Sequence, residues 1–337
     1  MTRRRLAVVA GLIALAALVA GIWLYRDFRR FTDSPLTESA TMIDVAFGTS
    51  LPGIVRDLQA RGIRTGLTLY WRVLARRMGV GDRLHAGEYA LDVGITPRGL
   101  LAKMAAGEVI QHRFTIVEGW TFAQLRNALV HAVDLKQTLS SIGDADIMRM
   151  LDAGGTPPEG WFLPETYQFV KGMSDADILR RAHTAMQREL DRLWDARAPE
   201  LPLTSKYQVL ILASIVEKET ARADERAKIA GVFEHRLQLG MRLQTDPSVI
   251  YGLGSAYDGK IHSRDLTTDT PYNTYTRAGL PPTPIALPGM AALEAVLHPQ
   301  TTDALYFVAR GDGTHEFSAT LEAHNRAVEK YQLHRNR

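Results

Sequence analysis

The sequence predicts an α+β protein that follows a single N-terminal transmembrane helix. Three features lead to this prediction: an uncharged apolar run near the N-terminus, short segments in which apolar and polar residues alternate, and longer segments with the apolar period of a helix. A length of 337 residues is sufficient for two domains. With 46% hydrophobic and 23% charged residues the composition is globular, which excludes a wholly disordered or collagen-like chain.

Charge and cysteine content exclude several classes of function. Forty lysines and arginines against 37 acidic residues give a net charge of +3, which is too small for a nucleic-acid partner held mainly through phosphates. The absence of cysteine excludes disulfides, iron–sulfur clusters and cysteine nucleophiles. The motifs H-E-x-x-H and G-x-S-x-G are absent, and a P-loop-like stretch at 254–260 precedes Ile261 instead of a magnesium-binding Ser or Thr. We therefore expect neither a metal nor another cofactor.

Residues 6–25 form the predicted membrane anchor. These twenty residues carry no charge, and as a helix they would span about 30 Å, the hydrocarbon thickness of a bilayer. Trp23 and Tyr25 stand at the far end, where interfacial aromatic residues are common. A cleaved signal peptide is one alternative, which a poor small-x-small cleavage pattern disfavours. A buried helix of a soluble protein is the other, and the unbroken apolar run disfavours it.

The charges that flank this span do not determine its orientation. Residues 1–5 contain three arginines, and three more follow at positions 26, 29 and 30, partly offset by Asp27. A single N-terminal span most often leaves its short end in the cytoplasm. We therefore expect residues 1–5 in the cytoplasm, a single-pass anchor in the inner (cytoplasmic) membrane, and the remainder of the chain on its periplasmic, extracytoplasmic side.

A linker and a small α+β module are expected after the span. Residues 26–41 are polar with one proline, which is typical of a linker. In residues 42–108 strand and helix patterns alternate. The expected elements are a strand at 43–47, a helix from a Ser50 cap to Gly62, a helix at 67–78, a strand at 88–91, and a helix from a Thr96 cap to Gly107.

Residues 109–337 form the larger predicted domain. The expected elements are an amphipathic helix at 174–197 capped by Ser174 or Asp175, a helix at 207–221, a helix that Asp224 caps and Gly240 ends, an Asp246 N-cap before Pro247, a hairpin of 305–309 with 315–317, and a helical tail from 321. The stretch 271–289 is rich in proline and glycine.

The helix at 207–221 carries the main catalytic candidate. Residues 209–216 are apolar on nearly every side, interrupted only by Ser214, which indicates a helix in the middle of a domain. Three charged residues follow, and the first, Glu217, lies over Ala213 and Ser214 on a helical period. Because these neighbours are small, its carboxyl would face space that its own helix does not fill. Partial burial raises a carboxyl pKa and suits a general acid; the alternative is the solvated end of a buried helix.

Two downstream segments supply candidate substrate-binding residues. One contains Gln244 and Asp246, although Asp246 fits a structural N-cap role better than a catalytic one. The other is a polar-aromatic stretch with Tyr272, Asn273 and Tyr275. Aromatic faces and amides suit sugar rings and N-acetyl groups, but they also suit any turn. These five residues are the predicted lining of a groove.

In these motifs the sequence resembles the endolytic murein transglycosylases of bacteria, the YceG-like family. Five motifs occur in the family's order: EGWFLPETY at 159–167, ASIVEKET at 213–220, RLQTDP at 242–247, YNTY at 272–275 and GLPP at 279–282. The N-terminal span and the GEY segment at 87–89 resemble the family's anchor and its LysM-like subdomain. Two positions depart from the pattern, since Glu165 stands where Asp is common and Leu287 where Asn is common.

The resemblance implies an organisation, a reaction and a catalytic residue. It implies an anchor at 6–25, a LysM-like subdomain at 42–108 and a YceG-like catalytic domain at 109–337. The family cleaves peptidoglycan strands internally, between N-acetylmuramic acid and N-acetylglucosamine, and leaves a 1,6-anhydromuramic end. The family's catalytic glutamate corresponds to Glu217. The expected partners are peptidoglycan glycan strands, the membrane and peptidoglycan synthases.

One carboxylate is sufficient for such a reaction. Ordinary glycosidases use two carboxylates, whereas here the substrate's own C6 hydroxyl attacks C1 and no water is required. We expect neutral Glu217 to protonate the departing glycosidic oxygen and then, once ionised, to accept the C6 hydroxyl proton. The substrate N-acetyl group or an amide such as Asn273 would stabilise the positive charge between these steps.

Three other functions fit parts of the sequence. A pyridoxal-phosphate lyase needs a Schiff-base lysine, for which Lys218 is the lysine beside the helix motif. A non-catalytic wall-binding scaffold would retain the fold without using Glu217. A hydrolytic muramidase would activate water, with Asp246 as the partner of Glu217. The masses of peptidoglycan digestion products distinguish all of these.

Overall fold

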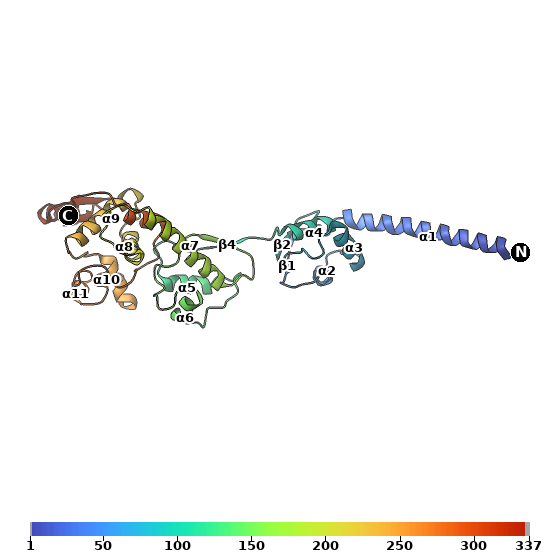
Figure 1. Cartoon of the computed structure of the whole chain (residues 1–337), viewed down its shortest axis with the longest axis horizontal. Helices are drawn as coiled ribbons and strands as arrows, with labels where there is room; N and C mark the ends of the chain where they lie inside the picture. The colour runs from blue at the N-terminus through green and yellow to red at the C-terminus, as the bar shows by residue number, and fades with distance from the viewer. Residues whose placement is uncertain (1, 334–337) are drawn as a thin grey trace. The chain divides into compact units, whose positions relative to one another are not determined.

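The structure is a computed structural model that describes residues 2–333, and it divides into two compact units (Figure 1). Unit 1 contains the chain up to His112 together with Gln168–Gly172. Unit 2 contains Arg113–Tyr167 and the chain from Met173 onward. Both helices and strands are present, so the predicted α+β class is confirmed.

The first helix, α1, runs from Thr2 to Asp33. Its segment Ala7–Asp33 is long and apolar enough to cross a membrane, and the side chains of residues 7–26 are exposed. Residues 26–33, which were expected in the linker, are helical. Phe28 packs in this extension against Tyr70, with ring centroids 5.6 Å apart, so tertiary contacts continue the helix beyond its apolar part.

Unit 1 contains a two-stranded sheet and three further helices. They are β1 (Thr41–Val45), α2 (Leu51–Ala60), α3 (Thr68–Met78), β2 (Gly87–Leu91) and α4 (Pro97–Ala106). β1 and β2 are antiparallel, with Thr41 opposite Leu91 and Val45 opposite Gly87. The helices and the sheet enclose a core in which Trp71 and Tyr89 are fully buried. All five elements match the predicted ones to within a few residues.

The two helix caps predicted in unit 1 differ in their outcome. Thr96 accepts a hydrogen bond from the Gly99 N–H at 3.1 Å and caps α4 as predicted. Ser50 occupies the N-cap position of α2, but its side chain makes no capping bond. That capping prediction is therefore wrong in its chemistry, although the helix begins where it was expected.

Unit 2 is mainly helical. Its helices are α5 (Phe122–Val130), α6 (Asp144–Met150), α7 (Asp175–Asp195), α8 (Lys206–Glu219), α9 (Ala223–Gln238), α10 (Asp246–Leu253), α11 (Ser263–Thr267), α12 (Met290–Leu297) and α13 (Leu321–Val328). Within this unit β5 (Tyr306–Ala309) pairs with β6 (His315–Ser318) as the predicted hairpin. The short strands β3 (His112–Thr115) and β4 (Thr166–Phe169) pair with each other, and each has residues in both units. Short helices η1 (Gly254–Ala256) and η2 (Glu329–Leu333) complete the chain that is described.

Helix α8 lies at the centre of unit 2. It contacts α7, α9, α10 and α12, and every side chain from Val209 to Val216 is buried (Figure 1). This confirms the prediction that an all-round apolar helix belongs in the middle of a domain. The helix ends at Glu219, because Thr220 has an extended backbone with φ −147°.

Two other capping predictions in unit 2 are wrong. Helix α9 begins at Ala223 with Arg222 at the N-cap, so Asp224 lies in its first turn, where it pairs with the Arg222 guanidinium at 2.7 Å. Helix α10 has Thr245 at its N-cap, and Asp246 is the first helical residue. Both aspartates still lie at helix N-termini, where the helix dipole favours negative charge. In contrast, Ser174 caps α7 as predicted and accepts from the Asp177 N–H at 3.1 Å.

Candidate active site

The buried part of α8 carries one polar side chain, and it connects the helix to a distant loop. The Ser214 hydroxyl donates to the Ile211 carbonyl at 2.7 Å and accepts from the Ile285 N–H at 2.9 Å. Both bonds are buried, so they compensate the desolvation of the hydroxyl and of the amide. The loop at 285–289 is thereby held against the last turns of α8, where Glu217 stands.

Glu217 is in the last turn of α8 with its side chain only 6% exposed. Its Oε2 accepts a hydrogen bond from the Gly289 N–H at 3.0 Å. Its Oε1 is 3.6 Å from Nη2 of Arg226, which lies on α9. Gly289 is the N-cap residue of α12, so the carboxyl faces the positive end of that helix. One backbone donor and one guanidinium therefore hold the carboxyl in a fixed position.

The environment raises the pKa of Glu217. Burial is the largest cause, and the nearby carboxylate of Glu118 raises it further. The Gly289 hydrogen bond and the charges of Arg226 and Lys218 act in the opposite direction but do not outweigh burial. Glu217 thus keeps its proton to a higher pH than a free glutamate, which is the state that a general acid requires.

Glu118 comes from a segment remote in sequence and lies against the same loop. It precedes Gly119, which has a φ of +75° and forms a turn after β3. The Gly119 N–H donates to the Leu287 carbonyl at 2.9 Å, and Lys218 Nζ donates to the Gly119 carbonyl at 3.3 Å. A Cβ at Gly289 would collide with the Glu118 carboxylate. The absence of a side chain at 289 thus allows Glu118 to approach the residue that bonds Glu217.

Three of the predicted groove residues meet on another side of α8. Gln244, Asp246 and Tyr275 line a cavity of about 540 Å³ together with Glu219. The Tyr275 hydroxyl donates to Asp246 Oδ1 at 2.6 Å, and the Thr245 hydroxyl donates to Glu219 Oε1. Side chains two residues apart on a helix point about 200° apart around its axis. Glu219 and this cavity therefore face away from Glu217, which is not among the lining residues.

The remaining two groove candidates shape the loop that contains them. Asn273 is buried, its Nδ2 donates to three backbone carbonyls of residues 265–268, and its Oδ1 accepts from the Tyr275 N–H at 2.9 Å. The Tyr272 hydroxyl bonds to the Thr283 hydroxyl at 2.9 Å. Both side chains therefore have polar groups engaged within the protein. A direct role of either residue in substrate binding stays a prediction.

Other buried carboxyls also have raised pKa values. Burial raises the pKa of Glu219 to about 7, despite the Thr245 hydrogen bond. Burial also raises the pKa of Glu159 to about 7, although its carboxylate accepts from the Phe122 N–H at 2.9 Å and from the Tyr251 hydroxyl at 3.0 Å. Glu159 thus connects the start of α5 to α10. Among residues 2–333, no cluster of three or more His, Asp or Glu side chains is arranged to hold a metal ion.

The chain matches one protein family along most of its length. A family model described as the YceG-like family matches residues 43–330. The chain belongs to the YceG-like family. The match covers both the small unit after α1 and nearly all of unit 2, and it confirms the resemblance that the five motifs indicated.

Relatives within the YceG-like family carry an enzymatic name. The endolytic murein transglycosylase of Bacillus subtilis strain 168 is 30% identical over 339 residues, which cover 95% of this chain and 92% of that protein. The endolytic murein transglycosylase of Streptococcus pneumoniae R6 is 27% identical, and the match covers 96% of this chain but 65% of that protein. A crystal structure of a YceG-like protein from Listeria monocytogenes matches with a TM-score of 0.54 and 29% identity, covering 86% of this chain and all of the other.

Glu118 and Arg226 were missed by sequence reasoning. Arg226 lies nine residues after Glu217, and a charged residue early in a new helix gives no sign that it points back to the previous one. Glu118 precedes a glycine turn and a Thr121 cap, a local pattern typical of any strand-to-helix turn. An acidic residue within such a turn is the only sequence signal for Glu118, and nothing in the sequence pairs Glu118 with Glu217.

Proposed function

We propose that this chain is a membrane-anchored endolytic peptidoglycan transglycosylase. It cleaves the bond between N-acetylmuramic acid and N-acetylglucosamine within nascent strands and leaves a 1,6-anhydromuramic end, which terminates or trims strand elongation. The observation that carries the proposal is the buried Glu217 carboxyl with its raised pKa and its fixed partners Gly289 and Arg226. The name of the Bacillus subtilis relative supports the choice of substrate and reaction.

In the first step Glu217 acts as the acid. It transfers its proton to the glycosidic oxygen while the bond from C1 to that oxygen breaks and positive charge develops on C1. The ionised carboxylate is then stabilised by the Gly289 N–H and by Arg226. Burial keeps the proton on Glu217 before the reaction, and these two partners reduce the cost of losing it.

In the second step the same carboxylate acts as the base. It accepts the proton of the C6 hydroxyl as the C6 oxygen bonds to C1, and the acid is regenerated. Because the nucleophile belongs to the substrate, orientation replaces the activated water of a hydrolase. Lys218 and Glu118 are exposed beside Glu217, so a glycan strand can approach from that side.

Hydrolysis is the second candidate reaction, and one observation favours it. A hydrolase uses two carboxylates, and the carboxylate of Glu118 lies beside Glu217. The partner expected from the sequence, Asp246, instead bonds to Tyr275 next to Glu219. If this chain is a muramidase, Glu118 and not Asp246 is thus the group to position water.

The other parts of the chain take supporting roles in the proposal. Helix α1 anchors the protein in the inner membrane, with the catalytic domain on the extracytoplasmic side and close to peptidoglycan synthases. Residues 42–108 form a LysM-like subdomain, which the order of two strands around two helices supports. The 540 Å³ cavity with Gln244, Asp246 and Tyr275 binds saccharide units of the strand away from the cleaved bond.

Replacing Glu217 tests the proposal. The Glu217→Gln variant keeps the size and the hydrogen bond to Gly289 but has no acidic proton, so we expect cleavage of purified peptidoglycan to fall by about 10²- to 10⁴-fold. Glu294→Gln is the matched control, because Glu294 is exposed on α12 in the same unit. Retained cleavage in Glu217→Gln would remove this residue from the mechanism. Absence of cleavage by the unaltered chain would favour a non-catalytic scaffold.

A further inference from the structure

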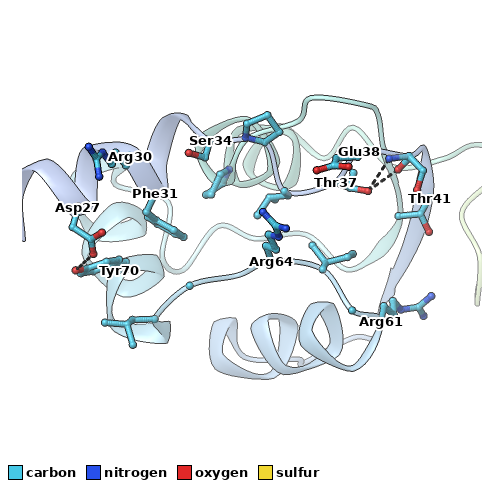
Figure 2. Close-up of a pocket in the computed structure, with 18 residues that line it drawn as sticks. Asp27, Arg30, Phe31, Ser34, Thr37, Glu38, Thr41, Arg61, Arg64 and Tyr70 are labelled. Atoms are coloured by element: carbon cyan, nitrogen blue, oxygen red, sulfur yellow. Dashed lines mark hydrogen bonds between the residues drawn. The ribbon is translucent and has the colours of Figure 1, made fainter.

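A second cavity lies in unit 1, next to the end of α1 (Figure 2). It has a volume of about 870 Å³, which is in the range of ligand-binding pockets. Its wall is formed by the last two turns of α1 and by the segments 34–41 and 61–67. Neither the YceG-like motifs nor the proposed reaction uses these residues. The cavity is therefore a candidate site of its own.

The cavity begins where the apolar part of α1 ends. The uncharged run stops at Tyr25, and lining residues start at Asp27 and continue through Arg30 to Ser34. At 1.5 Å per residue these positions lie roughly 3 to 14 Å beyond the apolar run. The polar headgroup layer adds about 5 to 7 Å on each side of the hydrocarbon core. If α1 spans the membrane as proposed, the cavity opens at the level of the headgroups.

Three arginines line the cavity. In Figure 2 Arg64 lies between Arg30 and Arg61. Within the part of the chain that the structure describes, the guanidinium groups of Arg30 and Arg64 make no hydrogen bond or ion pair, whereas Arg61 donates to the Met42 carbonyl at 3.2 Å. Guanidinium groups match the geometry of phosphate oxygens. The cavity thus has free donors for a phosphate group.

The two acidic residues of the lining offset part of this charge, and three arginines against two carboxylates leave one net positive charge. Asp27 accepts a hydrogen bond from the Tyr70 hydroxyl at 2.7 Å, and Glu38 is the other acidic residue of the lining. The rings of Phe31 and Tyr70 pack against each other, with centroids 5.5 Å apart, and Phe31 packs also on Trp71. Rings that are used in this way offer little face for a sugar to stack on, so the lining favours an anion over a neutral saccharide.

Positive charge is concentrated in the segment that supplies most of the cavity lining. Residues 26–83 contain ten arginines, no lysine and six acidic residues, an excess of four positive charges, whereas the whole chain has a net charge of +3. The rest of the protein is therefore close to neutral or slightly acidic. Basic residues close to an apolar span are attracted to anionic lipids. This segment thus carries the membrane-facing charge of the molecule.

Exposed apolar side chains adjoin the arginines. Leu67, which lines the cavity, and Leu69 are 60% and 62% exposed. They lie within three residues of Tyr70, which bonds to Asp27 of α1. A free phosphate ion gives no reason for exposed leucines at its site. A lipid does, because its acyl chains can cover leucines while its headgroup meets the arginines.

We infer that the free guanidinium groups of Arg30 and Arg64 bind the phosphates of anionic phospholipid headgroups at this cavity. The inference rests on the proposed anchoring by α1. The bound lipid holds unit 1 against the membrane surface. It gives this unit a fixed contact with the bilayer in addition to the single helix, which by itself leaves rotation about its own axis free.

The test is a lipid titration of the full chain purified in a non-ionic detergent. We expect dioctanoyl-phosphatidylglycerol to bind more tightly than the zwitterionic dioctanoyl-phosphatidylcholine. The double variant Arg30→Gln/Arg64→Gln is expected to bind the anionic lipid about tenfold more weakly or worse. The matched control is Arg56→Gln/Arg72→Gln, which removes the same charge from two exposed arginines outside the cavity and is expected to change the affinity less than twofold.

Several outcomes would overturn the inference. Equal losses in the two double variants would show diffuse attraction and no site. Displacement of the lipid by inorganic phosphate at the same concentration would assign the site to a free anion, and displacement by soluble peptidoglycan fragments would assign it to glycan.

Membrane fractionation of cells that express the full chain tests the anchoring separately, since binding in detergent does not require a span. Peptidoglycan cleavage by the double variant in detergent is expected to be unchanged, which separates this site from the proposed activity.

Discussion

In the proposed mechanism Glu217 meets two opposing requirements. It must hold a proton before the reaction, which burial and the neighbouring Glu118 carboxylate favour. It must also release that proton during bond cleavage, which the Gly289 N–H and Arg226 favour. The pKa of Glu217 is therefore set by a balance of named groups, and each of them can be changed separately.

Removing either charged neighbour of Glu217 is expected to shift the pH profile, in opposite directions. In the proposed mechanism cleavage needs protonated Glu217, so the rate falls as the pH rises through its pKa. Glu118→Gln removes a like charge and lowers that pKa, which moves the alkaline limb to lower pH. Arg226→Gln removes an opposite charge and moves the same limb to higher pH. The measurement is kcat/KM against pH.

These two variants together separate an electrostatic role from a structural one. Simple loss of packing would lower the rate in both variants without moving the alkaline limb. Shifts of the same sign, or none, would contradict the assignment of Glu217 as the acid. A Glu118→Gln variant that loses all cleavage at every pH would instead indicate that Glu118 takes part directly, as in a hydrolase.

At the scale of elements, the site depends on three segments that meet at the end of α8. The helix supplies Glu217, the turn after β3 supplies Glu118, and the N-terminus of α12 supplies the Gly289 N–H. Ser214 holds the loop before α12 through its bond to the Ile285 N–H. The geometry of the acid is thus set by contacts between elements and not by α8 alone.

The close approach at Gly289 gives a prediction for this arrangement. A Cβ in Gly289→Ala would collide with the Glu118 carboxylate, so either Glu118 or the bond from residue 289 to Glu217 must move. The colliding atoms belong to the exposed side chain of Glu118, so we expect its carboxylate to move away from Glu217. This removes one cause of the raised pKa of Glu217, so the alkaline limb of the rate profile moves to lower pH, as in Glu118→Gln. The measurement is kcat/KM on purified peptidoglycan against pH.

Gly143→Ala is a matched control for that substitution. Gly143 is also an N-cap glycine, with φ −72° against −78° at Gly289, but a Cβ there would meet only ordinary contacts. Both variants lose the same N-cap preference of glycine over alanine. Equal effects of the two substitutions on the rate profile would show that the contact with Glu118 is unimportant.

The sequence predicted elements well where one local pattern determines them. The apolar run of α8, the Thr96 and Ser174 caps, and the hairpin of β5 and β6 all appear as expected. Predictions failed where a neighbour in space competes. Asp246 was expected at an N-cap, but Thr245 takes that position and Asp246 bonds to Tyr275, which stands 29 residues later. The partners Glu118 and Arg226 were not predicted for the same reason.

At the scale of the whole molecule, buried carboxyls link stability to pH. Glu234 is buried, its Oε1 has no partner among the residues described, and burial raises its pKa to about 8 from 4.5. At pH values between 4.5 and about 8, Glu234 loses its proton in the unfolded chain and keeps it in the folded chain. The free energy of unfolding therefore falls as the pH rises through this window, by about 1.4 kcal/mol per pH unit for one such group at most.

Glu234→Gln removes this contribution to the pH dependence. We expect the melting temperature of the variant minus that of the unaltered chain to increase progressively from pH 5 to pH 8. The corresponding gain in the free energy of unfolding is about 1 kcal/mol or more. The exposed Glu294→Gln variant is expected to show no such trend. A difference in melting temperature between Glu234→Gln and the unaltered chain that stays constant from pH 5 to pH 8 would contradict the shifted pKa.

The two-unit organisation of the molecule was only partly visible in the sequence. The apolar span and the small module after it follow from local patterns, and the structure has their elements. The return of Gln168–Gly172 to unit 1 has no sequence signal, because it depends on tertiary contacts of a short segment. The concentration of arginines in residues 26–83 is visible in the sequence, but its meaning depends on the cavity that the fold creates beside α1.

The central claim is that Glu217 acts as a single proton carrier while the substrate supplies its own nucleophile. The most direct measurement is mass spectrometry of peptidoglycan digested by the full chain in ¹⁸O-labelled water. We predict new ends that carry no label and are about 20 mass units lighter than ends hydrolysed in this water, the mass of one ¹⁸O-labelled water. Labelled ends with the full mass of the added water would show that water is the nucleophile and would contradict the claim.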